Sequence, residues 1–333
     1  MNKTCFCDFD FEAALAKRGS VTKGYFNVAC KPDGSWVRFP IIVVSGIEEG
    51  PRLLVDGAHH GDEYEGVQAI IETANALDPK KLKGTFIGVP VLNMEAFMYG
   101  NRISPMDYST LNLNRAYPGT PEGFITSRIV DAYLQNIVKK STHIITFHGG
   151  GDALYLDPLA SYIPGNDSAD ASYRMAKAFG VEILWRMEDV PFGGFLNAEA
   201  AKLGIPCITP EVGSQSIQHP YANRRRHIDI CATGIANVMK SLRMIEGNIV
   251  PQAERQIDIT LIYLCSNAGG IHVVKKMPVE PFVKGEVLAE IFDVFGEKVG
   301  ETLAPEDGVM VGYGVYPVVL PGNWSILYGR VNS

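Results

Sequence analysis

The sequence predicts an α/β fold with a parallel or mixed sheet flanked by helices, followed by a small all-β region. From about residue 40 to 246, short apolar runs alternate with longer segments of helical period, a pattern typical of strands and helices that alternate along the chain. After Gly247 the sequence is rich in β-branched residues, glycine and proline, and turn signals recur every eight to twelve residues. We therefore place one domain over residues 1–250 and a second over residues 251–333.

The expected strands are short apolar runs bounded by turn residues, as buried strands commonly are. In chain order they are Ile41–Val44, Leu53–Val55, Phe86–Val91, Ile144–Phe147, Ile183–Trp185 and Cys207–Thr209.

Three helices are expected between and after these strands. Glu65–Ala76 is predicted to be helical because its apolar residues recur on one face at helical spacing. Thr120–Pro121 is expected to start a second helix, with the threonine as N-cap and the proline at the first position, and Lys139–Lys140 to close it. A long last helix is expected over about Pro220–Ile245.

Composition and charge exclude several classes of protein. Of the 333 residues, 46% are apolar and 20% are charged, proportions typical of a globular protein with a buried core. The formal net charge of −7 argues against DNA, RNA and anionic membranes as partners. The basic run Arg224–Arg226 is interpreted as a solvated or interface helix face rather than a nucleic-acid patch.

The sequence also shows no sign of export or of a membrane span. Asp8, Asp10 and Glu12 stand where a signal peptide would need an apolar stretch, and the longest apolar runs are far shorter than the roughly 20 residues of a membrane helix. The six cysteines are then expected to be reduced thiols, and the protein to be cytoplasmic. The sequence leaves open whether the chain forms a homo-oligomer.

Polar side chains cluster after four of the expected strands, where ligands bind in open α/β sheets. The first cluster, His59–Glu63, follows strand Leu53–Val55. A histidine and an acid three residues apart can both turn toward one metal ion, since imidazole nitrogen and carboxylate oxygen are good zinc ligands. The spacing alone leaves the register open, because His59 with Asp62 fits as well as His60 with Glu63.

The second cluster is His148, which is followed by Gly149–Gly151. His143 on the same strand is the rival candidate for a metal ligand. His143 lies at the start of the strand, whereas His148 follows its carboxyl end. His148 is therefore the better placed of the two to bind a ligand.

The third cluster is the long loop 93–119, which contains Arg102, Asn114 and Arg115. A loop of this length is usually functional, and a guanidinium group suits two-pronged capture of a carboxylate. The alternative is that the two arginines merely pair with Asp107 or with other acids.

The fourth cluster contains Glu211, just after strand Cys207–Thr209. A glutamate in this place could serve as a general base, although by itself it is an ordinary loop acid.

Taken together and in this order, the clusters resemble the succinylglutamate desuccinylase/aspartoacylase family, which shares the zinc carboxypeptidase fold. The resemblance covers roughly residues 20 to 331, and residues 257–331 are similar to the family's small β-domain, a biotinyl/lipoyl-like barrel. The matching motifs are Gly57–Glu63, Val91–Asn93 leading to Arg102, Leu113–Gly119, Phe147–His148 and Thr209–Gly213.

The resemblance implies a function and a role for each residue. It sets the metal-binding register on His60 and Glu63, and with His148 these would hold one Zn²⁺ per chain. Glu211 would be the general base and Arg102 would stabilise the oxyanion. Asn114 and Arg115 would hold the substrate α-carboxylate. The implied reaction is hydrolysis of the amide bond of a small N-acyl, in the first place N-acetyl, amino acid.

Within the family, the residues around His60, Arg102 and His148 resemble most the deacetylases of ectoine breakdown, which act on N-acetyl-2,4-diaminobutyrate. One position departs from the family pattern: Thr146 stands where an aspartate, two residues before the third ligand, usually orients it. Asp152 is a nearby acid that could take over that task.

Two other functions are compatible with the same residues. A metallocarboxypeptidase or amidase would use the same metal centre and carboxylate clamp on a peptide. A non-catalytic binding protein on this fold is suggested by Thr146, although Glu211, Arg102 and Arg115 argue against it.

Overall fold

The structure is a computed structural model that describes residues 9–188, 193–214 and 221–332. Its helices and 3₁₀ turns are α1 Phe11–Ala16, α2 Glu65–Ala76, α3 Met94–Tyr99, η1 Leu113–Arg115, α4 Ile125–Asn136, η2 Val138–Lys140, α5 Ala169–Phe179, α6 Leu196–Lys202 and α7 Tyr221–Ser241.

The strands divide at residue 250 into two groups. The first is β1 Ser20–Cys30, β2 Trp36–Ser45, β3 Glu48–Asp56, β4 Lys83–Val89, β5 His143–Thr146, β6 Leu154–Leu156, β7 Leu159–Tyr162, β8 Ile183–Arg186 and β9 Cys207–Glu211. The second is β10 Ile257–Cys265, β11 Gly270–Val274, β12 Pro281–Phe282, β13 Val287–Phe292, β14 Lys298–Leu303, β15 Gly308–Gly314, β16 Val318–Val319 and β17 Trp324–Val331.

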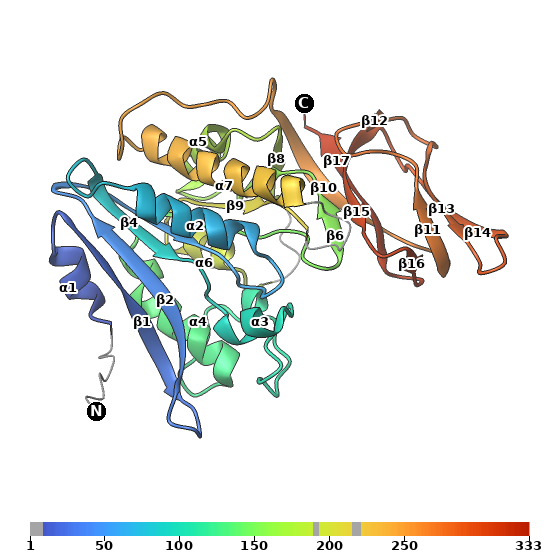
Figure 1. Cartoon of the computed structure of the whole chain (residues 1–333). Coiled ribbons are helices and arrows are strands. Elements are labelled where there is room, and N and C mark those ends of the chain that lie inside the picture. Colours follow the sequence, from blue (N-terminus) through green and yellow to red (C-terminus); the bar gives the residue numbers. More distant parts are fainter. Residues whose placement is uncertain (1–8, 189–192, 215–220, 333) are drawn as a thin grey trace.

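One long mixed sheet runs through the part of the chain that the structure describes (Figure 1). Its order is β1-β2-β4-β3-β5-β9-β7-β8-β10-β17-β15-β12, with β6 paired to β15. The pairs β4–β3, β3–β5 and β5–β9 are parallel, so the carboxyl ends of β3, β5 and β9 meet at one edge. The predicted α/β fold with a mixed sheet is confirmed.

Helices cover both faces of this sheet. Each strand packs against both layers of helices, because successive residues point to opposite faces. On β2, Ile42 and Val44 pack into a core with α2, α5 and α7. Ile41 and Val43 of the same strand pack into a second core with α1, α4 and α6. Burial on both faces explains why these strands read as continuous apolar runs.

All six expected strands are present, and α2 has the predicted bounds. The second expected helix begins later than predicted, at Ile125, because Thr120–Gly123 forms a turn in which the Gly123 N–H donates to the Thr120 carbonyl. Proline suits position i+1 of such a turn as well as the start of a helix. The last helix ends at Ser241, before the predicted end, and Pro220 lies outside the described residues.

The C-terminal residues form strands, as predicted, but they divide between two sheets. Strands β10, β17, β15 and β12 extend the long sheet, and a separate four-stranded sheet has the order β14-β13-β11-β16. Leu288, Met310 and Tyr328 are among the residues that fill the core of this region. Strand β10 joins the two parts of the chain, since it pairs with β8 on one side and β17 on the other.

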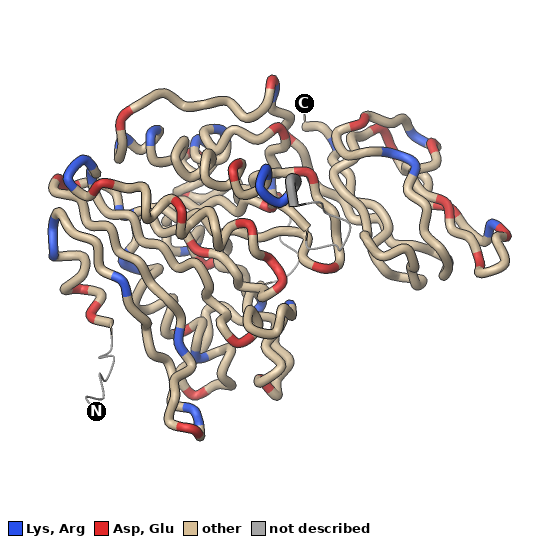
Figure 2. Tube along the Cα trace, viewed as in Figure 1, with Lys and Arg blue, Asp and Glu red and all other residues tan. Residues whose placement is uncertain are grey.

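Charged residues of both signs are interspersed along the trace (Figure 2). Arg225, from the basic run at the start of α7, forms ion pairs with Glu72 of α2 at 2.8 Å and with Asp229 of its own helix. At least this arginine of the run therefore ties two helices together. No helix in the described part of the chain is both long and apolar enough to cross a membrane.

Candidate active site

The ends of three neighbouring strands bring the metal-ligand candidates and the candidate base together. His60 and Glu63 follow β3, His148 follows β5, and Glu211 is the last residue of β9. The backbone continues to pair beyond β5, because the His148 N–H donates to the Pro210 carbonyl and the Val212 N–H donates to the His148 carbonyl, both at 2.9 Å. These bonds fix His148 beside Glu211.

Two features of the backbone shape the loop that carries His60 and Glu63. Gly61 passes so close to the neighbouring chain that a Cβ there would lie 2.1 Å from the Ala96 carbonyl carbon. Ala58 has a φ of +48°, a conformation that non-glycine residues seldom adopt. Such strained residues cluster at functional sites, where the surrounding structure holds them in place.

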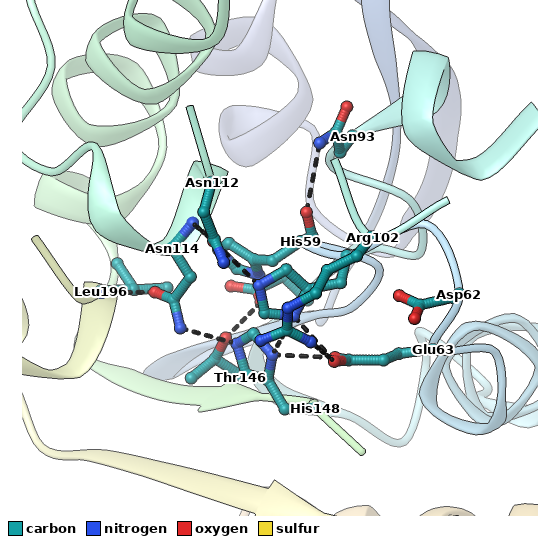
Figure 3. Close-up of polar contacts among 12 residues, drawn as sticks. His59, Asp62, Glu63, Asn93, Arg102, Asn112, Asn114, Thr146, His148 and Leu196 are labelled. Carbon is teal, nitrogen blue, oxygen red and sulfur yellow. Dashed lines mark hydrogen bonds and ion pairs between the residues drawn. The ribbon is translucent and has the colours of Figure 1, made fainter. Parts of the chain in front are cut away.

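The side chains of His60, Glu63 and His148 lie close together and are nearly fully buried. Figure 3 shows Glu63 and His148 turned toward each other. His60 Nδ1 lies 2.7 Å from Glu63 Oε1, and His148 Nδ1 lies 2.9 Å from Glu63 Oε2. The two Nδ1 atoms are 3.2 Å apart. The structure therefore brings together the residues of the register His60 with Glu63, which the resemblance implied, and adds His148 to them.

These three residues fit a metal ion of the zinc type. Zn–N bonds of 2.0–2.1 Å in tetrahedral geometry place two ligand nitrogens about 3.3 Å apart, close to the separation of the two Nδ1 atoms. Two imidazole nitrogens and one carboxylate also match the donor set of catalytic zinc sites with an open fourth position.

The distal nitrogen of His60 is held by the loop that precedes η1. His60 Nε2 lies 2.9 Å from Asn112 Oδ1, an atom that can only accept a hydrogen bond. A proton on Nε2 can therefore point to Asn112, and Nδ1 faces the cluster. Asn112 was not among the predicted site residues, although it lies two positions before Asn114.

Asn114 is placed against His148 rather than in an open cleft. Its Oδ1 accepts a hydrogen bond from the Leu196 N–H at 3.1 Å, and its Nδ2 lies 3.1 Å from His148 Nε2. The side chain is 9% exposed. In this arrangement Asn114 orients His148, and its proposed contact with a substrate carboxylate stays a prediction.

Opposing influences act on the charge of Glu63. Burial raises the pKa of this carboxyl, but the neighbouring His60 and His148 lower it more, so the pKa lies well below its usual range. For His148, burial lowers the pKa while Glu63 raises it, and the net direction is down. Metal binding requires an ionised carboxylate and ligating nitrogens that carry no proton.

Glu211 is half-buried beside this cluster. Burial and then the nearby charge of Glu63 raise its pKa well above the usual range, whereas Arg102 and Arg115 lower it. A cation held by Glu63 would offset the repulsion between the two carboxylates. An acid perturbed in this way, in a polar cluster, is a candidate general base.

The two arginines have different surroundings. Arg102 Nη1 donates to Glu63 Oε1 at 3.0 Å, and its side chain is 44% exposed. The Arg115 guanidinium lies over the Phe195 ring at 4.1 Å and donates to the Asn114 carbonyl. In the described part of the chain, no carboxylate oxygen lies within 4.0 Å of an Arg115 nitrogen, which leaves this cation free for a ligand.

The rival candidates have other partners. His59 Nε2 bonds to the Tyr117 hydroxyl, and Asp62 Oδ2 accepts from the Asp152 N–H. Asp107 accepts hydrogen bonds from the Ser109 and Thr126 N–H groups and forms no ion pair with either arginine among the described residues. The alternative that the arginines pair with other acids holds for Arg102, which pairs with Glu63. His143 Nδ1 lies next to the hydroxyl of its neighbour Thr142, away from the cluster.

Comparison with known proteins places the chain in a family. Residues 49–242 match the model of the succinylglutamate desuccinylase/aspartoacylase catalytic domain. An N-alpha-acetyl-L-2,4-diaminobutyric acid deacetylase from Halomonas elongata is 30% identical over 312 residues, which cover 90% of this chain and 87% of the relative.

Solved structures agree with this match over nearly the whole chain. The product-bound ectoine utilization protein EutE (DoeB) from Ruegeria pomeroyi has a TM-score of 0.84 at 25% identity and covers 94% of this chain and 96% of its own. A succinylglutamate desuccinylase from a Silicibacter species has a TM-score of 0.83 at 26% identity and covers 96% of this chain and 97% of its own. With its His–Glu–His cluster at the ends of β3 and β5, this chain belongs to the succinylglutamate desuccinylase/aspartoacylase family.

Proposed function

We propose that the protein hydrolyses the amide bond of a small N-acyl amino acid and that it depends on one Zn²⁺ held by His60, Glu63 and His148. The observation that carries this proposal is the convergence of these three buried side chains beside Glu211. Membership of a family of deacylases supports the reaction class. An imidazole and carboxylate donor set supports zinc among the divalent metals.

The bound metal would polarise the acyl carbonyl and lower the pKa of water to about 7. In the proposed mechanism, Glu211 accepts a proton from the attacking water and delivers it to the nitrogen of the leaving amine. Arg102, which is hydrogen-bonded to Glu63, donates a hydrogen bond to the oxyanion of the tetrahedral intermediate. Asn112 holds His60 in position from behind, and Asn114 lies against the ring of His148.

Arg115 is proposed to bind the α-carboxylate of the substrate. Burial and then the proximity of Arg102 lower the pKa of Arg115, so an anion between the two guanidinium groups would relieve their repulsion. The aromatic face of Phe195 holds the guanidinium plane from one side.

Replacing Arg115 by lysine is expected to raise KM roughly tenfold with little change in zinc content, because a planar fork becomes a single ammonium group. Steady-state kinetics with a saturating metal supply measures the change. The matched control is Arg128→Lys, since Arg128 lies on α4 and donates to the Gly123 carbonyl. An unchanged KM would remove Arg115 from carboxylate binding.

N-acetyl-2,4-diaminobutyrate is the substrate that we propose to test first, because the Halomonas relative carries that activity in its name. The assay is release of primary amine by zinc-loaded protein from N-acetyl and N-succinyl amino acids and from a few dipeptides. Protein treated with a chelator and the Glu211→Gln variant serve as blanks.

Release from N-acyl amino acids that is absent from both blanks is the expected result. Cleavage of dipeptides alone would assign the chain to the carboxypeptidases. No release from any substrate, together with no zinc retained, would favour a binding protein on the same fold.

We further propose the cytoplasm as the compartment. In support, the four described cysteines, Cys30, Cys207, Cys231 and Cys265, are free thiols. We also propose that the chain forms two domains, residues 1–250 and 251–333, and that the second domain is a biotinyl/lipoyl-like barrel. The change of composition at Gly247 and the separate core around Met310 support this division.

A further inference from the structure

A second polar cluster lies directly behind the proposed metal ligands. It consists of Asp56, His59, Tyr117, Tyr133 and Thr146, each at most 5% exposed. Two hydroxyl groups donate to the Asp56 carboxylate: Thr146 Oγ1 lies 2.7 Å from Oδ1 and Tyr133 Oη lies 2.5 Å from Oδ2. A buried carboxylate needs such donors, since water cannot reach it.

Asp56 and Thr146 tie together the two strands that deliver the metal ligands. They are register partners in the parallel β3–β5 pair, and each is the last residue of its strand. The Phe147 N–H also donates to the Asp56 carbonyl at 2.9 Å. His60 follows Asp56 by four residues and His148 follows Thr146 by two, so this junction sets the distance between the two ligand-bearing segments.

His59 connects this cluster to the ligand His148. The ring centroids of His59 and His148 are 5.2 Å apart at an interplanar angle of 32°. His59 Nε2 lies 2.8 Å from the Tyr117 hydroxyl, and its Nδ1 lies 3.3 Å from Asp56 Oδ1. The ring of His59 is therefore hydrogen-bonded through Nε2, whereas its Nδ1 faces Asp56 without a hydrogen bond, and the ring packs beside that of His148.

We propose that Asp56, Thr146 and His59 are positioning residues for His148, with the acid on β3 and the hydroxyl on β5. This inference rests on the proposed function of His148 as a metal ligand. The family's usual aspartate is missing at position 146. In this chain Asp56, on the neighbouring strand β3, supplies a carboxylate that accepts a hydrogen bond from the Thr146 hydroxyl. Asp152 does not take this part, since its side chain is exposed and its N–H donates to Asp62.

The test compares the unchanged protein with Thr146→Val, which keeps the shape of the side chain but removes the hydroxyl. Zinc affinity is measured by competition with a chromophoric chelator. We expect a loss of affinity of up to about 10-fold, the lower end of the range for lost partners of metal ligands, because Thr146 reaches His148 only through Asp56 and His59. Thr146→Ser, which keeps the hydroxyl, is expected to bind zinc as the unchanged protein does.

Two further variants separate positioning from a general loss of stability. Ser325→Ala removes a fully buried hydroxyl between His272 and Thr302, far from the cluster in the sequence, and should leave zinc affinity unchanged. The exchange variant Asp56→Thr with Thr146→Asp restores an acid–hydroxyl pair and should bind zinc more tightly than Thr146→Val.

A second readout does not depend on zinc. Long-range ¹H–¹⁵N spectra report the surroundings of the His59 and His148 rings through their chemical shifts, and we expect Thr146→Val, but not Ser325→Ala, to change these shifts. If the unchanged protein binds no zinc, the proposed function is wrong and these spectra alone decide the inference. Spectra and affinities of Thr146→Val that match those of Ser325→Ala would overturn it.

Discussion

Glu211→Gln is expected to lower kcat by about 10²- to 10⁴-fold, the usual contribution of a general base, while bound zinc is retained. The variant keeps the size of the side chain but cannot accept a proton from water. Metal content should be unaffected, because Glu211 is not among the three converging ligand residues. Single-turnover amine release with metal analysis of the same sample measures both quantities.

The control for this experiment is Glu199→Gln. Glu199 is a buried glutamate that lies on α6 and pairs with Lys202. Its replacement should leave turnover close to that of the unchanged protein. If Glu211→Gln turned over substrate at the same rate as Glu199→Gln, another group would have to be the base.

His148→Ala is expected to abolish zinc binding at micromolar protein concentrations and to reduce turnover to the level of the chelator-treated protein. Loss of a ligand should cost more than the 10- to 100-fold typical of residues that only support a ligand. It would also leave Glu63 buried without one of the two histidines that lower its pKa. Atomic emission after dialysis, together with the amine assay, measures the two effects.

His143→Ala is the matched control, because His143 lies on the same strand and was the rival candidate in the sequence. Its Nδ1 lies beside the Thr142 hydroxyl and takes no part in the cluster. The variant should keep both zinc and activity. Equal losses in the two variants would mean that β5 as a whole had been disturbed, and His148→Gln would then be needed to isolate the ligand.

The sequence predicted those helices, strands and site residues that depend on interactions between residues close together in the chain. The apolar face of α2 gave its bounds, and the buried strands were recognisable as apolar runs. The order of polar clusters after strands predicted which side chains would meet, because the ends of parallel strands share one edge. His60, Glu63 and His148 do converge there.

Other features escaped prediction for physical reasons. Strand β1 was missed because it is half-exposed at the sheet edge and mixes polar with apolar residues. The bonds from Tyr133 and Thr146 to Asp56 span 77 and 90 residues, and no spacing rule connects residues so far apart. The contact of Asn114 with His148 likewise depends on how loop 93–119 folds back over the strand ends.

The pairing of β10 with both β8 and β17 means that the boundary at residue 250 is not a boundary in the hydrogen-bonded sheet. Strand β10 covers the edge of β8, where Ile183 and Trp185 carry apolar side chains. An uncovered edge of this kind is a template for pairing with other chains. We therefore expect a chain that ended at residue 250 to expose the edge of β8 and to aggregate more readily.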